Sequence, residues 1–373
     1  MNISAESFMD LQAHQINALP PNGGSGTYSY SKNSYFQKQS SSVEESKIEE
    51  EIHKKLDVKK LACASNMIIR VVDLGCATGP NTFMNAQNVL EAIKNKYQSQ
   101  CQNSAIMPEF HVFFNDQPSN DFNTLFTSLP HERNYYASGV PGSFYDRLFP
   151  NSSLHFASST YALHFLSKSP DVLQDINNPA WNKGRIHYTS ASKAVVDAYA
   201  AQFAKDAGNF LDARAAELVP GGMLVIVMQG VPNGMPYSDI INGMLYDSMG
   251  SILIELSKEG KFDESQVDYF NLPFYAPSPE EMTKLIEMNS RFSIERMELT
   301  NPAPWLKSTA QVIPEWIIHV RAAMEAIFIR HFGNEVTHEM FQRLTKHMLD
   351  KSEMLEAKYR DKIQFFVVLK RIE

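Results

Sequence analysis

The sequence has little cysteine, no excess of positive charge and no long apolar run. Its three cysteines, Cys63, Cys76 and Cys101, are too few for a disulfide framework, which favours a reducing compartment. The formal net charge of −8 argues against a nucleic-acid partner, which would favour a basic surface. Residues 1–15 lack a basic segment followed by an apolar one, and no stretch reaches membrane-spanning length. We therefore expect a cytoplasmic protein that binds neither nucleic acid nor membrane.

Several catalytic motifs are also absent. The sequence contains no H-E-x-x-H or other zinc spacing, no G-x-S-x-G elbow and no G-x-x-x-x-G-K-[ST] loop. These absences disfavour a zinc enzyme, a serine hydrolase and a P-loop NTPase. The hydrophobic content of 43% in 373 residues nevertheless supports a sizeable core, either one large domain or a core with a smaller cap.

The segment 68–83, IIRVVDLGCATGPNTF, is the most informative part of the sequence. An apolar strand reaches Asp73, the chain turns through Gly75 and Gly79, and a helix begins at Asn81. A glycine turn that leads into a helix N-terminus is typical of sites for nucleotide-like ligands. The spacing G-x-x-x-G is not G-x-G-x-x-G, so a dinucleotide is disfavoured. D-L-G-C-x-x-G-P-N-T instead resembles the opening loop of methyltransferases that bind S-adenosylmethionine (SAM).

The remaining pattern alternates strands with helices. Helices are predicted at 43–56, 81–97 and 192–218, and strands at 68–74, 109–116, 153–158, 223–229, 292–299 and 363–369. The early alternation indicates a parallel sheet with helices on both faces. After residue 230 the sequence becomes mostly helical and rich in methionine and phenylalanine, which suggests insertions that form a lid.

Residues at the strand ends suggest a nucleoside site. Asp116 ends the strand at 109–116, and its carboxylate could accept both hydroxyls of a ribose. A strand-end acid that caps the next turn is the ordinary explanation. Ser143 and Phe144 would offer adenine a polar contact and a flat apolar face, although Phe144 could equally be a core residue.

Two sets of side chains recur at helical spacing and could form pocket walls. They are Tyr30, Asn33, Ser34 and Gln37, and Tyr161, His164 and Phe165. A solvated helix face and a buried, hydrogen-bonded histidine are the ordinary explanations for the two sets. Oxygen donors that would suit Mg²⁺ occur at Asn182, Asp268 and Asn271, although a simple turn explains the last two equally well.

Eight segments in order resemble the plant SABATH family of SAM-dependent methyltransferases. They run from about Ser29 to the C-terminal part of the chain: YSYSKNSYFQK, VVDLGCATGPNTF, FFNDQPSNDFNTLF, GVPGSFYDRLFP, SSTYALHFLSK, WNKGRIHY, DYFNLPFYAP and VRAAMEAIFIRHFG. Members of that family methylate carboxylic acids or, in one branch, xanthine nitrogens. The resemblance implies an α/β class I SAM-dependent methyltransferase (Rossmann-like) sheet with an α-helical cap, usually as a homodimer.

The implied organisation divides the chain into five parts. Residues 1–27 would be a flexible leader, and residues 28–230 the SAM-binding core with an N-terminal lid helix. Residues 231–290 and 303–360 would form the helical cap. Residues 291–302 and 361–373 would supply the late strands of the core sheet.

The resemblance also implies the residues of the site. SAM would contact Tyr30, Asp73, Cys76, Asn81, Asp116, Gln117, Ser143 and Phe144. The acceptor would contact Tyr30, Asn33, Gln37, Tyr161, His164, Phe165, Met228, Tyr246, Phe274, Trp316, Ile317 and His319. A structural Mg²⁺ would be held by Asn182, Asp268, Asn271 and the carbonyl of Phe270.

Position 165 departs from the commonest family pattern. Most carboxyl-methylating members have tryptophan there, and Phe165 cannot donate the hydrogen bond that an indole N–H gives to a carboxylate. Gln37 then remains as the main donor, with His164 as a second. Members similar to farnesoate methyltransferase also carry His-Phe at positions 164 and 165. No catalytic base is assigned, because a carboxylate is already ionised at pH 7.

The largely apolar candidate wall favours a small, largely apolar acid as acceptor. Two alternatives within the same fold remain: N-methylation of a xanthine-like heterocycle, and methylation of a glycosylated iridoid acid such as loganate. A SAM-binding protein without activity and a nicotinamide-dependent dehydrogenase are further alternatives. The absence of G-x-G-x-x-G disfavours the dehydrogenase.

Overall fold

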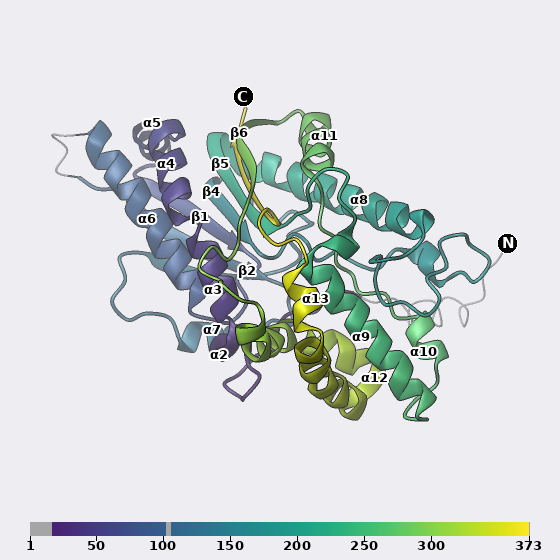
Figure 1. The fold of residues 1–373 in the computed structure, drawn as a ribbon. Helices are drawn as coiled ribbons and strands as arrows, with labels where there is room; N and C mark the ends of the chain where they lie inside the picture. The colour runs from purple at the N-terminus through teal and green to yellow at the C-terminus, as the bar shows by residue number, and fades with distance from the viewer. Residues whose placement is uncertain (1–16, 102–105, 373) are drawn as a thin grey trace, which may run out of the picture.

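A seven-stranded sheet forms the centre of the computed structural model, which describes residues 17–101 and 106–372 (Figure 1). The spatial order of the strands is β3-β2-β1-β4-β5-β7-β6. Their bounds are β1 Ile68–Leu74, β2 Glu109–Asp116, β3 Tyr136–Pro141, β4 Leu154–Thr160, β5 Leu218–Gln229, β6 Phe292–Thr300 and β7 Gln364–Arg371. The bounds of β1 and β2 are those predicted, because each apolar run stops at a strand-end acid or a glycine turn.

The sheet is mixed: the strands of the early alternation are parallel, as predicted, whereas the direction of the last strand had not been predicted. Strands β3, β2, β1, β4 and β5 pair in parallel, whereas β7 runs antiparallel to both β5 and β6. Most of β7 is buried, and a continuous apolar run has the same pattern in either direction. Strand β3 was not predicted, because YASGVP is an edge strand with little burial and contains glycine and proline.

Helices cover both faces of the sheet (Figure 1). One face carries α4 (Glu45–Lys55), α5 (Val58–Ala64) and α6 (Asn81–Gln100), which pack with Val71 and Val225. The opposite face carries α8 (Lys193–Glu217) and α11 (Pro279–Asn289), which pack with Val72 and Leu224. Neighbouring residues of one strand therefore point into different cores, as the two-residue period of a strand requires.

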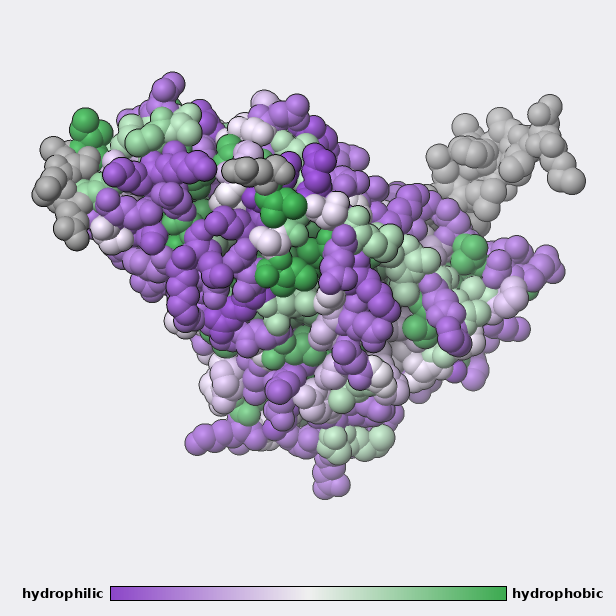
Figure 2. Space-filling view, turned by 90° about the horizontal axis from the view of Figure 1, so that it is seen from above, coloured by the Kyte–Doolittle hydropathy of each residue, from purple (hydrophilic) through white to green (hydrophobic). Residues whose placement is uncertain are grey.

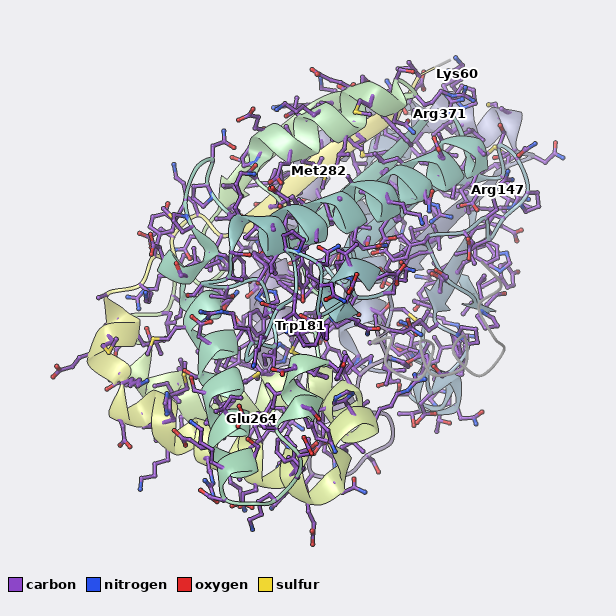
Figure 3. The ribbon with its side chains drawn as sticks, turned by 90° about the vertical axis from the view of Figure 1, so that its right-hand side faces the viewer. Lys60, Arg147, Trp181, Glu264, Met282 and Arg371 are labelled. Atoms are coloured by element: carbon purple, nitrogen blue, oxygen red, sulfur yellow. The ribbon has the colours of Figure 1, made fainter. Side chains whose placement is uncertain are left out.

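The remaining helices lie mainly around the cap at the lower end of the view in Figure 1. The longest, α12, contacts α9 and also α2 and α3 near the N-terminus, and it bends at Gly333, where φ is +80°. Figure 3 shows α8 above the cap helices, with Trp181 between them and Glu264 on the cap. The bounds are α2 Tyr30–Asn33, α3 Tyr35–Ser42, α7 Phe122–Thr127, α9 Ile241–Lys258, α10 Ser265–Asp268, α12 Ile313–Asp350 and α13 Ser352–Glu356.

The face of the molecule opposite the cap is mainly hydrophilic. Figure 2 views it from that end and shows apolar residues gathered mainly in a central area, with smaller patches toward the sides. Within residues 17–101 and 106–372, no helix is both long and apolar enough to cross a membrane.

Candidate active site

A cavity of about 680 Å³ lies where the carboxyl ends of β1, β2, β4 and β5 meet the cap. Its volume lies within the usual range for small-molecule sites, and this edge of an α/β sheet is where ligands usually bind. Sixteen of the residues predicted for cofactor and acceptor line it: Tyr30, Gln37, Asp73, Cys76, Asn81, Asp116, Gln117, Ser143, Phe144, Tyr161, His164, Phe165, Tyr246, Phe274, Trp316 and His319.

The glycine turn after β1 depends on the absence of a side chain at Gly75. Its φ is +85°, and a Cβ atom there would lie 2.3 Å from the Cβ of Ala162. The N–H groups of Gly75 and Cys76 both donate to the carbonyl of Asn115, at 2.9 and 3.0 Å. The turn is therefore held against the end of β2, and the backbone after β1 is fixed along the cavity.

Asp116 is positioned to accept further hydrogen bonds. Its Oδ2 accepts from the N–H of Ala77 at 2.8 Å, and its Oδ1 accepts from the N–H of Gln117 at 2.7 Å. Each carboxylate oxygen can accept a second bond, so both ribose hydroxyls can be accommodated. The same two backbone hydrogen bonds cap the turn after β2, as the ordinary explanation for a strand-end acid predicted. Capping this turn is compatible with binding a ribose.

Two buried carboxylates give this end of the cavity its electrostatic character. Burial raises the pKa of Asp116 to about 6, against the effect of its two backbone hydrogen bonds. Burial also raises the pKa of Asp73 to about 6, where a hydrogen bond from Thr82 opposes the shift and the charge of Asp116 adds to it. A positive charge beside these groups would stabilise their ionised forms. This end of the cavity therefore favours a cationic ligand such as a sulfonium.

The loop that carries Ser143 and Phe144 is held from behind by a buried ion pair. Arg214 and Glu217 of α8 pair at 2.7 Å, and both side chains are fully buried. Arg214 also donates to the carbonyl of Phe144 at 2.7 Å, and Glu217 accepts from the N–H of Leu148. The sequence analysis did not identify this pair, which fixes the apolar face proposed for adenine.

Gln37 faces the other half of the cavity with a defined amide orientation. Its Oε1 accepts a hydrogen bond from Nδ2 of Asn81, which also donates to the carbonyl of Ser34 at 3.1 Å. Nε2 of Gln37 is therefore the end of the amide that remains for a ligand. Asn81 uses its own N–H groups to join the start of α6 to the N-terminal helices, so only its oxygen remains for the cofactor.

His164 is a neutral donor on the cavity lining. Its Nδ1 accepts from the N–H of Gln229 at 3.4 Å, which leaves the proton on Nε2. Burial lowers the pKa of the imidazole to about 3, so it is uncharged at pH 7. The rings of Phe165 and Phe274 lie 4.8 and 4.7 Å from it, which gives this donor an apolar setting.

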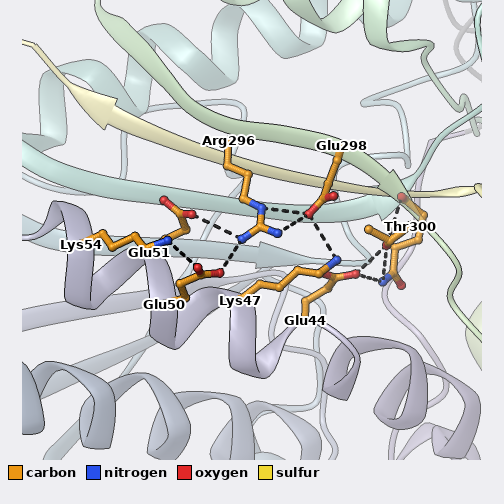
Figure 4. A network of polar contacts seen from close by, with 9 residues as sticks. Glu44, Lys47, Glu50, Glu51, Lys54, Arg296, Glu298 and Thr300 are labelled. Atoms are coloured by element: carbon orange, nitrogen blue, oxygen red, sulfur yellow. Dashed lines mark hydrogen bonds and ion pairs between the residues drawn. The ribbon is translucent and has the colours of Figure 1, made fainter.

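Tyr161 is fixed by a chain of hydrogen bonds that leaves the cavity. Its hydroxyl donates to Oε1 of Gln364, whose Nε2 donates to Oε1 of Glu44 at 2.8 Å. Thr300 donates to the same carboxylate oxygen at 2.6 Å. Glu44 belongs to a wider group of charged residues that ties α4 to β6 (Figure 4). The phenol is therefore held from the N-terminal helices and from the late strands together.

Three predicted acceptor contacts lie outside the cavity lining. Met228 does not line the cavity and is fully buried in the core, because its neighbour Gln229 points to the cavity and adjacent residues of a strand point to opposite faces. Asn33 donates instead to the carbonyls of Thr27 and Ser29, and its own carbonyl accepts from Nδ1 of His319. The predicted wall residue Ile317 also lies outside the lining.

The predicted magnesium ligands lie together, away from the cavity lining. Nδ2 of Asn182 donates to Oδ1 of Asn271 at 2.8 Å, and Oδ1 of Asp268 accepts from the N–H of Gly184 at 2.7 Å. Oδ1 of Asn182 is buried without a hydrogen-bond partner, whereas the side chain of Phe270 packs on Phe328. One free amide oxygen and one carboxylate fit Mg²⁺ weakly. In the described part of the chain, no three His, Cys, Asp or Glu side chains form a metal-binding group.

Several lining residues were missed in the sequence. Gln229, Asn242, Asn301 and Arg360 add polar groups to the cavity, and residues 17–21 also line it. A glutamine at the end of the apolar strand β5 was the only local signal. Residues 17–27 belong to the predicted leader, and the rest of that leader lies outside the described residues.

Comparison with known proteins identifies the family. The sequence model of the family described as SAM-dependent carboxyl methyltransferases matches residues 16–372 of the chain. The chain belongs to this family. The resemblance to SABATH methyltransferases is thereby confirmed, as is the class I methyltransferase fold with SAM as cofactor. The enzyme is a SAM-dependent carboxyl methyltransferase.

Individual relatives agree with this assignment. The chain is 44% identical to loganic acid O-methyltransferase of Catharanthus roseus, over 95% of each chain. It is 39% identical to farnesoic acid carboxyl-O-methyltransferase of Arabidopsis thaliana, over 94% of this chain and 97% of the relative. A solved structure of loganic acid methyltransferase with SAH matches with a TM-score of 0.89 and 42% identity, over 95% of this chain and 99% of that one.

Proposed function

We propose that this enzyme methylates the carboxylate of a small, largely apolar acid and that Gln37 and His164 orient that carboxylate. The observation that carries the proposal is that two uncharged donors, Nε2 of Gln37 and Nε2–H of His164, belong to residues that line the same cavity. Phe165 and Phe274 pack beside His164, and other aromatic residues line the same cavity. Such a lining favours an anionic head group on an apolar skeleton.

The chain contributes orientation and exclusion of water rather than proton transfer. Bound SAM supplies a methyl group on a positively charged sulfonium. Asp116 would hold the ribose, and Asp73 would stabilise the cationic methionine end. Gln37 and His164 would hold one carboxylate oxygen in line with that methyl group, while the cap excludes water. Because the acceptor is already ionised at pH 7, no side chain has to remove a proton.

The two relatives named above support a carboxylic acid as acceptor. One is named for loganic acid and the other for farnesoic acid, so both names specify a carboxylic acid. The aromatic side chains of Tyr246, Phe274 and Trp316 favour an apolar skeleton.

The experiment is methyl transfer from isotopically labelled SAM to a panel of acids and xanthines. The panel contains farnesoate, jasmonate, cinnamate, benzoate, salicylate, indole-3-acetate, gibberellin and loganate. A base-labile, extractable ester would support the proposal and identify the acid class. A base-stable xanthine product would instead support N-methylation, and SAM binding without any labelled product from this panel would count against the proposed acceptor.

Three finer predictions belong with this proposal. A structural Mg²⁺ would be held by Asn182, Asp268, Asn271 and the carbonyl of Phe270, and metal analysis of purified protein tests this. A homodimer would give twice the chain mass of 42.2 kDa in light scattering. A cytoplasmic location would be tested with a fluorescent fusion protein.

A further inference from the structure

Four polar side chains that the proposed carboxylate site does not use line one part of the cavity. They are Gln229, Asn242, Asn301 and Arg360, which we call the polar wall. Backbone contacts bring their segments together. The N–H of Gly230 donates to the carbonyl of Ile363 at 2.9 Å, and the N–H of Ile241 donates to the carbonyl of Tyr359 at 3.1 Å. Thr300, which precedes Asn301, pairs with Gln364 of β7.

The polar wall contains a donor and an acceptor side by side. Oε1 of Gln229 accepts from the hydroxyl of Tyr237 at 3.1 Å and from Nδ2 of Asn242 at 2.7 Å. These contacts fix both amides, so Nε2 of Gln229 remains as a donor and Oδ1 of Asn242 remains as an acceptor. An alcohol hydroxyl both donates and accepts, and it can therefore satisfy the two groups together.

The charge of the polar wall is already balanced. Arg360 donates to Oε2 of Glu356 at 2.6 Å and also to Thr309. Burial raises the pKa of Glu356, but hydrogen bonds from Arg360, Ser308 and backbone N–H groups outweigh that effect and hold it at about 2. Glu356 is therefore ionised at pH 7 and neutralises Arg360. Lys168, another cation on the cavity lining, pairs with Asp171 at 2.6 Å.

A second acidic group on the acceptor would thus meet no unpaired cation at the polar wall, whereas neutral hydroxyls would meet matched partners. The wall also begins beside His164, since the N–H of Gln229 donates to that imidazole. An acid held at its carboxylate by His164 could therefore reach the wall with another part of the same molecule.

We propose that the polar wall selects acids that carry at least one alcohol hydroxyl remote from the carboxylate. This inference rests on the proposed function and adds a second recognition site to it. The aromatic residues bind the carbon skeleton, and Gln229 and Asn242 bind the hydroxyl. Burying an unmatched donor and acceptor costs more than their hydrogen bonds contribute, so the corresponding deoxy acid should be disfavoured.

The test compares pairs of acids that differ by one hydroxyl group. ω-Hydroxy and mid-chain hydroxy fatty and terpenoid acids are each measured against the deoxy parent, with saturating SAM. We expect kcat/KM of the wild-type enzyme to favour the hydroxylated acid about tenfold or more in at least one pair. In Asn242→Leu that ratio should fall to within about twofold of one. Asn95→Leu, an exposed substitution on α6, is the matched control and should retain the wild-type ratio.

Gln229→Met provides a second variant of similar shape in case Asn242→Leu does not fold, and calorimetric SAM binding reports folding in each variant. Equal methylation of hydroxylated and deoxy acids by the wild type would overturn the inference and leave the proposed function standing. A preference that persists in both variants would also overturn it. If no acid of either kind is methylated, the proposed function itself fails.

Discussion

Substitution of Gln37 by glutamate should lower kcat/KM more than substitution by alanine. Gln37→Glu keeps the chain length and an oxygen that can accept from Asn81, so the contact between α3 and α6 is preserved. It replaces the donor Nε2 with a second carboxylate oxygen that faces the acceptor. Gln37→Ala removes the donor without adding a charge.

The magnitudes follow from the two interactions. Loss of a hydrogen bond to a charged group costs about 1.5–3 kcal/mol, so Gln37→Ala should lower kcat/KM roughly 10- to 150-fold. Two carboxylates about 4 Å apart repel by about 4 kcal/mol at an effective dielectric constant of about 20. Gln37→Glu should therefore lower kcat/KM by at least a further tenfold, and by up to about 10³-fold, relative to Gln37→Ala.

The assay is kcat/KM for the best acid of the panel, with the Kd of SAM measured by calorimetry. Gln39→Glu places the same new charge on the same helix and serves as control, with activity within about twofold of wild type. If kcat/KM of Gln37→Glu equals or exceeds that of Gln37→Ala, the assignment of Gln37 as a donor is refuted. Unchanged catalytic efficiency in Gln37→Ala would remove Gln37 from the site altogether.

Three further predictions concern the cofactor half and the stability of the fold. Gly75→Ala should destabilise the protein by about 2–4 kcal/mol in thermal unfolding, because of its positive φ and the contact with Ala162, whereas Gly208→Ala in open space on α8 should stabilise it by up to about 1 kcal/mol. Binding of cationic SAM near pH 6 should release protons from Asp73 and Asp116, and the affinity for SAM should weaken as the pH falls from 7 to 5. Calorimetry in buffers of different ionisation enthalpy measures the proton release, and finding none would contradict the prediction. Because folding raises both pKa values, the contribution of these carboxyls to unliganded stability should decrease as the pH rises from about 4 to about 6. Arg296→Met, which removes ion pairs to three glutamates (Figure 4), should cost about 1 kcal/mol or less, and the cost should diminish in high salt.

The cofactor half of the site could be predicted because its residues are close in sequence. Asp73, Cys76 and Asn81 follow one another through a single turn, and Asp116 ends the next strand. Glycine in that turn has a steric reason that the structure makes explicit at Gly75. The local pattern therefore predicted the strand ends and a nucleotide-like ligand, and the resemblance to methyltransferase loops specified SAM.

The acceptor half could be predicted only through the family resemblance, and then incompletely. Gln229, Asn242 and Arg360 come from β5, α9 and the segment before β7, and no spacing in the sequence connects them. Met228, predicted as an acceptor contact, is buried in the core, whereas its neighbour Gln229 lines the cavity, because adjacent side chains of a strand point in opposite directions. The position of Arg360 depends on the direction of β7, and that direction could not be predicted from the apolar run of this strand.

The environment of Tyr161 shows why such a site needs the whole fold. Its backbone is held by the N–H bond to Val227, and its hydroxyl by Gln364, which is bound in turn by Glu44. Glu44 and Gln364 are separated by 320 residues in the chain. Both are fully buried, so the loss of either would leave a polar group without its partner. The position of the phenol is therefore coupled to the docking of the N-terminal helices and to the pairing of the last strand, and neither can be read from residues near position 161.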